Sequence, residues 1–246
     1  MQSSGYLGED TSGYWRKLLK ADDPIPEGFI RRTDSPLKIL RPRFNSFIER
    51  VARRIAPLSC IGSEDLPAPP FILASNHSSI LDFPAVLFCL PGNLREKTVA
   101  IYKSAYDRNP FTKFFIKLFT KSLPVDMDKK PWEALSAAEK VLRSGNCIYI
   151  APEGTRSRTG EILPFKPGVG ALAVETRSPI VPVLIEGADK VLPRGSLFPK
   201  KNRIKVLFGK SIDTRAFFES KRSRPAYDVY KDAAELIREK ILELKK

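Results

Sequence analysis

Two hydrophobic periods take turns along the chain from residue 71 onward. Short apolar runs of strand length are bounded by polar residues, and between them apolar positions recur at helical spacing. The predicted strands are 71–74, 98–102, 147–151, 180–187 and 204–209. The predicted helices are 81–90, 110–121, 131–142, 168–176 and 227–246. This alternation predicts an α/β fold with a largely parallel central sheet covered by helices.

The chain before this pattern divides into two parts. Residues 1–36 mix Gly, Ser, Pro and charge without a period, which predicts a weakly ordered lead or linker. Residues 37–60 predict a basic amphipathic helical segment, and residues 61–246 a single domain. The helical segment either packs on the core or lies in a membrane interface. Its candidate membrane-binding residues are Phe44, Phe47, Arg50, Arg53 and Arg54.

The composition narrows the classes of partner that the protein could bind. Forty-two Lys and Arg against 28 Asp and Glu give a formal charge of +14, which attracts phosphates of nucleic acids, lipid headgroups or small substrates. The apolar runs are far shorter than the roughly 18 residues of a spanning helix, so any work on lipid is expected at the membrane surface.

The three cysteines, Cys60, Cys89 and Cys147, are odd in number and form no CxxC pattern. We therefore expect neither a disulfide framework nor a thiolate zinc site, and a reducing, cytosol-facing compartment. A histidine metal site is not expected either, because the chain has one histidine.

That histidine, His77, lies in the stretch NHSSILDFP, between a predicted strand and a predicted helix. Loops of this kind often present catalytic groups. Asp82 follows five residues later, and a carboxylate on one ring nitrogen would leave the other nitrogen free as a base. The alternative is a structural histidine bonded to nearby backbone, with Asp82 capping the helix.

A second polar loop, APEGTRSRTG at 151–160, also follows a predicted strand. Gly154 allows close approach to the backbone, Thr155 and Ser157 offer hydroxyls, and Arg156 can bind two anionic oxygens. We expect a phosphate site here. The alternative is an ordinary polar turn with Glu153 and Arg156 paired at the surface.

Taken together, NHSSILD and PEGTRS resemble the His-x4-Asp and phosphate-binding motifs of the glycerolipid acyltransferases typified by 1-acylglycerol-3-phosphate acyltransferase. The resemblance extends over residues 71–209. It implies one acyltransferase domain in which His77 is the general base, Asp82 orients it, and residues 153–157 bind the acceptor phosphate. The implied donor is an acyl thioester, from acyl-CoA or an acyl-carrier protein, and no cofactor is expected.

The resemblance also implies Lys103 and Lys166 as substrate-binding candidates, but Met127 stands where the family often has Arg in a block linked to the acceptor. Other acceptors therefore stay open: glycerol 3-phosphate, another lysophospholipid or a non-phosphate lipid. The expected location is the cytoplasmic face of a membrane with an anionic surface, without a nucleic-acid partner. The alternative of another class is a non-catalytic basic protein that binds nucleic acid or a membrane surface.

Overall fold

A computed structural model describes residues 50, 54–104, 108, 121–125, 131–196 and 198–246. Within these ranges the strands form a seven-stranded sheet in the order β1-β7-β6-β2-β5-β3-β4. The strands are β1 (Leu58–Ile61), β2 (Ile72–Ser75), β3 (Thr98–Lys103), β4 (Lys121–Val125), β5 (Cys147–Ile150), β6 (Ile180–Glu186) and β7 (Ile204–Phe208). β2 to β6 are parallel, whereas β7 is antiparallel to β6 and parallel to β1.

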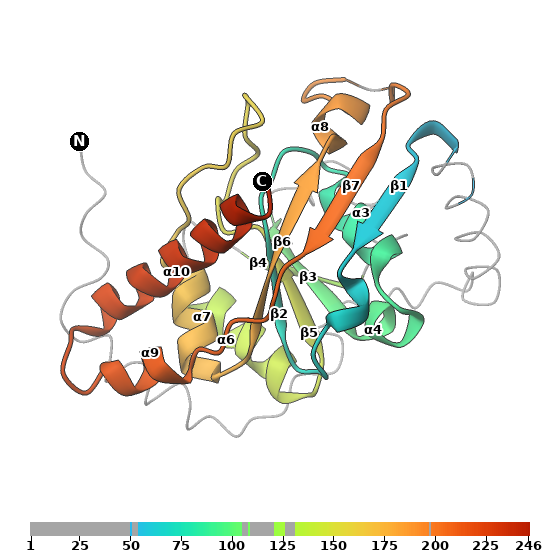
Figure 1. Ribbon diagram of the computed structural model, residues 1–246. Helices are drawn as coiled ribbons and strands as arrows, with labels where there is room; N and C mark the ends of the chain where they lie inside the picture. The colour runs from blue at the N-terminus through green and yellow to red at the C-terminus, as the bar shows by residue number, and fades with distance from the viewer. Residues whose placement is uncertain (1–49, 51–53, 105–107, 109–120, 126–130, 197) are drawn as a thin grey trace.

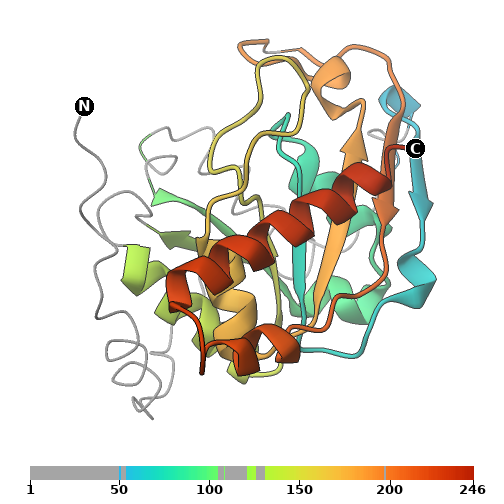
Figure 2. The same cartoon turned by 60° about the vertical axis from the view of Figure 1, so that its left-hand side comes forward.

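Helices cover both faces of the sheet (Figures 1 and 2), which confirms the predicted fold class. The elements are η2 (Ser63–Asp65), α3 (Asp82–Cys89), α4 (Gly92–Lys97), α6 (Pro131–Arg143), α7 (Gly168–Thr176), α8 (Ala188–Val191), α9 (Arg215–Ser220) and α10 (Ala226–Glu243). α3 and α4 pack on one face, and α6, α7 and α10 pack on the other. In the ranges that the structure describes, no helix combines the length and the apolar character that crossing a membrane requires.

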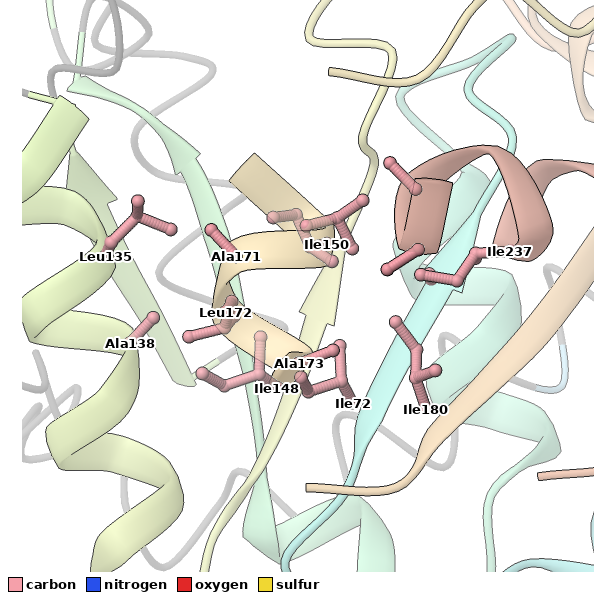
Figure 3. Close-up of a cluster of buried hydrophobic side chains, with 14 of the residues drawn as sticks. Ile72, Leu135, Ala138, Ile148, Ile150, Ala171, Leu172, Ala173, Ile180 and Ile237 are labelled. Atoms are coloured by element: carbon pink, nitrogen blue, oxygen red, sulfur yellow. The ribbon is translucent and has the colours of Figure 1, made fainter. Parts of the chain in front are cut away.

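The central strands are apolar on both sides because both faces are covered. Ile72 and Ala74 of β2 point into the core under α7 and α10, while Phe71 and Leu73 point into the core under α3. Figure 3 shows the first of these cores, in which strand residues meet side chains from α6, α7 and α10. A continuous apolar run such as FILA is the sequence pattern of this environment.

α7 and α10 approach each other closely at Gly170. A Cβ atom added there would lie 2.0 Å from the carbonyl oxygen of Tyr230, so only glycine permits this contact. α10 therefore holds the C-terminal part of the chain against the helix that follows the APEGTRSRTG loop.

Some sequence predictions differ from the structure. Residues 58–60, assigned to the helical segment, belong to strand β1, because they pair with β7. Lys121, assigned to the end of a helix, begins strand β4 because residues 121–125 pair with β3. The rest of that predicted helix lies outside the described residues, as do residues 1–36. Of the candidate membrane-binding residues, Arg50 and Arg54 are exposed, and Phe44, Phe47 and Arg53 lie outside the described residues.

The cysteine prediction is wrong. Cys60 of β1 and Cys89 at the end of α3 form a disulfide across 29 positions of sequence, because α3 packs beside β1. The third cysteine, Cys147, is free and buried, and burial raises the pKa of its thiol to about 11. The inference of a reducing compartment rested on the absence of a disulfide and loses its basis.

Candidate active site

Both predicted site loops lie at the carboxyl ends of the central strands. β2 leads into the loop that holds His77, and its neighbour β5 leads into the loop that holds residues 153–157. The chain leaves β2 through α3 on one face and leaves β5 for α7 on the other. In open α/β sheets, ligands commonly bind where adjacent parallel strands change direction in this way. Figure 1 shows the two loops at the same end of the sheet.

His77 and Asp82 form a hydrogen-bonded pair. The ring Nδ1 of His77 lies 2.8 Å from Oδ2 of Asp82, which is the first residue of α3. The Asp82 side chain is 1% exposed and the His77 side chain 23%, so the carboxylate is shielded while the ring reaches solvent. The turn of residues 78–81 brings together two residues that are five apart in sequence.

The carboxylate of Asp82 sets the tautomer of His77. Its Oδ2 also accepts hydrogen bonds from the backbone N–H groups of Ser78 and Ser79, each at 2.8 Å. Because Asp82 serves as acceptor in all these contacts, the Nδ1 of His77 carries the proton. Nε2 is then the lone-pair nitrogen that can take a proton from a substrate.

The PEGTRS loop holds the backbone of His77 from both sides. Oε1 of Glu153 accepts a hydrogen bond from the N–H of His77 at 2.9 Å, and the N–H of Ser157 donates to the carbonyl of His77 at 2.8 Å. The structure thus brings the two sequence motifs together. Glu153 is buried and its Oε1 is directed at His77, so the alternative of a polar turn paired at the surface does not apply.

Glu153 is a buried carboxyl group, and its surroundings change its chemistry. Burial raises its pKa to about 7, although hydrogen bonds from the backbone of His77 and Leu163 act in the opposite direction. Its Oε2 and the Oγ of Ser157 are buried without a hydrogen-bond partner among the described residues. Buried polar atoms normally have a partner, so these two atoms mark unused hydrogen-bonding capacity beside His77.

The turn around Gly154 brings Lys166 to the predicted phosphate site. Gly154 has φ +68°, and a Cβ atom there would lie 2.9 Å from Cε of Lys166. The backbone N–H of Lys166 donates to the carbonyl of Pro152 at 3.1 Å, which holds the lysine along the turn. Thr155 is exposed and Arg156 is partly exposed. Lys166 therefore lies against the turn that directly precedes Thr155 and Arg156.

Lys103 lies at the same edge of the sheet, on a different strand. It is the last residue of β3, which pairs with β5. The residue proposed from the sequence thus lies at the carboxyl end of a strand neighbouring the PEGTRS loop.

Sequence reasoning missed the residues that hold the His77 loop in place. The side-chain amide of Asn76 donates to the carbonyl of Ile185 at 2.9 Å and accepts from its N–H at 2.8 Å. One residue earlier, Oγ of Ser75 lies 2.7 Å from Oη of Tyr149, whose ring packs on Phe83. The position of Asn76 next to His77 was the one available signal, because its partner Ile185 is 109 residues away.

The arrangement combines a histidine ring whose Nε2 is free with a turn whose cations can attract an anion. In the described part of the chain, no three His, Cys, Asp or Glu side chains gather as metal ligands. Nε2 of His77 can remove a proton, and the cations of the neighbouring turn suit a phosphate.

Comparison with known proteins identifies the family. Residues 57–186, more than half of the chain, match the family model described as Acyltransferase. The chain belongs to the Acyltransferase family. Both loops of the candidate active site lie inside the matched region.

Related proteins share this assignment. The chain is 31% identical over 170 residues to a 1-acyl-sn-glycerol-3-phosphate acyltransferase of Cocos nucifera, covering 67% of this chain and 53% of the relative. It is 34% identical over 125 residues to the beta enzyme of that name from Homo sapiens, covering 48% of this chain and 41% of the relative. The chain spans about half the length of the curated relatives it matches.

A solved structure shows the same fold. The crystal structure of the 1-acyl-sn-glycerophosphate (LPA) acyltransferase from Thermotoga maritima superposes with a TM-score of 0.62 at 22% identity. The match covers 95% of this chain and 89% of that chain. At this identity the likeness establishes the architecture alone.

Proposed function

We propose that this protein transfers a fatty acyl group from a thioester donor to the hydroxyl of 1-acylglycerol 3-phosphate. The observation that carries the proposal is the His77–Asp82 pair, held on its backbone by the PEGTRS loop. The names of the Cocos nucifera and Homo sapiens relatives support this acceptor.

The reaction needs one base and no covalent enzyme intermediate. The hydroxyl oxygen of the acceptor attacks the thioester carbonyl carbon while its proton passes to Nε2 of His77. Asp82 stabilises the resulting imidazolium through Nδ1. The tetrahedral intermediate then expels the thiolate, the C–S bond breaks, and the imidazolium returns the proton to sulfur. The products are the diacyl lipid and a free thiol.

The turn at Gly154 would bind the acceptor phosphate. Arg156 can hold two phosphate oxygens through its guanidinium, and Lys166 adds a second positive charge along the turn. Because the same loop is hydrogen-bonded to His77, phosphate binding would place the acceptor hydroxyl beside the base. Lys103, at the end of β3, is the third proposed contact.

The donor and the location complete the proposal. Acyl-CoA and acyl-carrier protein present the same thioester, and neither requires a cofactor. An anionic membrane surface would supply the acceptor, and the charge of +14 suits such a surface. Nucleic acid is not a proposed partner, because the chain belongs to the Acyltransferase family and the proposed lipid surface and acceptor phosphate would suit its positive charge.

Thiol release from a long-chain acyl-CoA, with lysophosphatidic acid in vesicles, tests the function directly. Product is identified by mass, and wild type is compared with His77→Ala. General-base catalysis is typically worth about 100-fold to 10,000-fold, so we expect the variant to lose at least about 100-fold in turnover. Tyr227→Ser, on the exposed first turn of α10, is the control and should retain activity.

Two results would contradict the proposal. Near-wild-type turnover in folded His77→Ala would exclude the base role. Transfer to glycerol 3-phosphate or to a non-phosphate lipid in preference to lysophosphatidic acid would keep the chemistry and replace the acceptor. The same assay with acyl-carrier protein as donor decides between the two thioesters.

A further inference from the structure

The α8–β7 loop, residues 192–203, exposes a large aromatic side chain among cations. Phe198 is 79% exposed, the highest value among the large hydrophobic residues that the structure describes. The loop and the preceding helix α8 also expose five basic side chains: Lys190, Arg194, Lys200, Lys201 and Arg203. None of the five forms an ion pair with a described residue. Packing among the described residues explains neither the exposure of Phe198 nor the five cations that have no ion pair there.

This loop lies at the active-site end of the sheet. β6 is parallel to β2, so α8 follows β6 at the same edge at which His77 follows β2. Figures 1 and 2 both show the α8–β7 loop at the end of the molecule that carries the loops after β2 and β5. A surface that bound this loop would therefore face the active-site edge.

Hydrogen bonds connect the loop to the His77 loop. Oγ of Ser79 donates to the carbonyl of Leu192, the first residue of the α8–β7 loop, at 3.1 Å. Asn76 holds the end of β6 through both backbone groups of Ile185. The residue after Ser79, Ile80, is 52% exposed. Two of the large exposed hydrophobic side chains thus lie on loops that are bonded to each other.

A further exposed cation adjoins the other end of the loop. The N–H of Ile204, directly after Arg203, donates to the carbonyl of Pro57 at 2.9 Å. Arg54, three residues before Pro57, is exposed. The basic surface therefore continues from the α8–β7 loop toward the segment that precedes β1.

We propose that the α8–β7 loop is a docking surface for an anionic lipid bilayer, with Phe198 inserted at the interface and the neighbouring cations on lipid headgroups. Aromatic side chains sit well at this depth, and Lys and Arg keep their charge at the headgroups while their stems cover apolar surface. A nucleic acid would also attract the cations, but the aliphatic Ile80 offers no stacking surface to bases. Docking here sets His77 toward the leaflet that holds the lipid acceptor. The inference rests on the proposed function for the kind of surface involved.

Vesicle binding by the full chain tests the proposal. Partition is measured on phosphatidylcholine vesicles with and without phosphatidylserine, for wild type and two variants. Lys200→Gln/Lys201→Gln should weaken partition to the anionic vesicles roughly 25-fold, because each cation near such a surface contributes roughly fivefold. Phe198→Ser should weaken it about tenfold, since partial burial of a phenyl ring is lost.

The matched control removes two charges elsewhere. Lys210→Gln/Lys231→Gln changes the net charge equally, but Lys210 follows the far end of β7 and Lys231 lies on α10. This control should bind the anionic vesicles within about twofold of wild type, because its cations lie away from the membrane. An equal loss in the control double variant would overturn the proposal, as would wild-type binding by both loop variants or a preference for single-stranded RNA over vesicles.

Activity separates this inference from the proposed function. With short-chain substrates dispersed below their micelle concentration, the loop variants should keep wild-type turnover and lose activity on vesicles alone. If the protein transfers no acyl group but the loop variants lose vesicle binding, the proposed function is wrong and the docking surface is supported. If the loop variants bind vesicles like wild type and acyl transfer is normal, the docking surface is wrong and the proposed function is supported.

Discussion

The core under α7 and α10 and the carboxyl edge of the sheet use burial in opposite ways. In the core, apolar side chains such as Ile72 and Ile237 fill the space, and Gly170 lets two helices approach closely. At the carboxyl edge the buried groups are polar: Asp82 and Glu153 are almost fully covered. Burial in the first region stabilises the fold, while in the second it positions groups and shifts their protonation. Substitutions in the two regions should therefore affect different measurements.

The largest expected effect is the loss of catalysis in Asp82→Asn. The amide would no longer fix the proton on Nδ1 of His77, so the base nitrogen would be lost in much of the population. We expect turnover to fall by about 1,000-fold to 10,000-fold, equal to about 4 to 5 kcal/mol of barrier. Steady-state kinetics on the folded variant measures this. Activity within tenfold of wild type would show that the edge is not organised around this pair.

In the core, Ile237→Ala should lower stability and leave turnover unchanged. Ile237 is fully buried on α10, so its truncation leaves a cavity and should lower the free energy of unfolding by about 4 kcal/mol. Turnover below the melting transition should stay at the wild-type value. Urea unfolding with parallel kinetics checks both, with Ile80→Ala as an exposed control that should change stability by less than about 0.5 kcal/mol. A large drop in turnover would break the separation between core and edge.

The disulfide links the two kinds of region, because Cys89 ends the helix that Asp82 begins. Cys60→Ser should lower the free energy of unfolding by about 3 kcal/mol, since the cross-link restricts the unfolded chain. Wild type in a thiol reductant should show the same loss, and Cys60→Ser should be indifferent to the reductant. Equal stability of wild type with and without reductant would contradict the prediction.

The smallest expected effect is a pH dependence from Glu153. Its pKa is raised to about 7, so between the ordinary glutamate value and about 7 the folded state holds a proton that the unfolded state has released. This contribution to stability is fully present below about pH 4.5 and is lost as the pH rises to about 7. Glu153→Gln cannot ionise, so its stability relative to wild type should rise across this window, by on the order of 2 to 3 kcal/mol, because each pKa unit is worth about 1.4 kcal/mol.

Urea unfolding of both proteins at several pH values across that window measures the difference. A stability difference that is constant with pH, or that shrinks as pH rises, would contradict the expected sign. Such a result would mean that the carboxyl group of Glu153 is no less ionised in the folded protein than in the unfolded chain.

Local patterns predicted the elements whose environment is uniform along the chain. The sequence predicted the strands β2, β5 and β6 because both of their faces are buried. It predicted the helix α10 because one face of that helix packs on the core. β1 and β4 lie at the two edges of the sheet, where less burial leaves a weaker apolar signal. The antiparallel direction of β7 was also missed, because strand direction depends on the connection through α8 and not on composition.

The contacts of the candidate site also divide into those that the sequence predicted and those that it did not. His77 and Asp82 are five residues apart, so one turn can join them, and their pairing was predictable from the sequence. The contact of Glu153 with the backbone of His77 joins residues 76 apart, and no local pattern encodes such a distance. The same holds for the Cys60–Cys89 bond, which the odd cysteine count concealed.

By itself, the sequence determined the fold class and predicted the His77–Asp82 pair and a loop suited to a phosphate, because each depends on residues close together in the chain. Tertiary structure alone decided that the PEGTRS loop holds the backbone of His77 and that Asn76 holds the end of β6. It also decided that Phe198 stands exposed at the active-site edge. Parallel strands bring distant carboxyl ends to one edge of the sheet, and the resulting neighbours follow from strand order, which the sequence does not state.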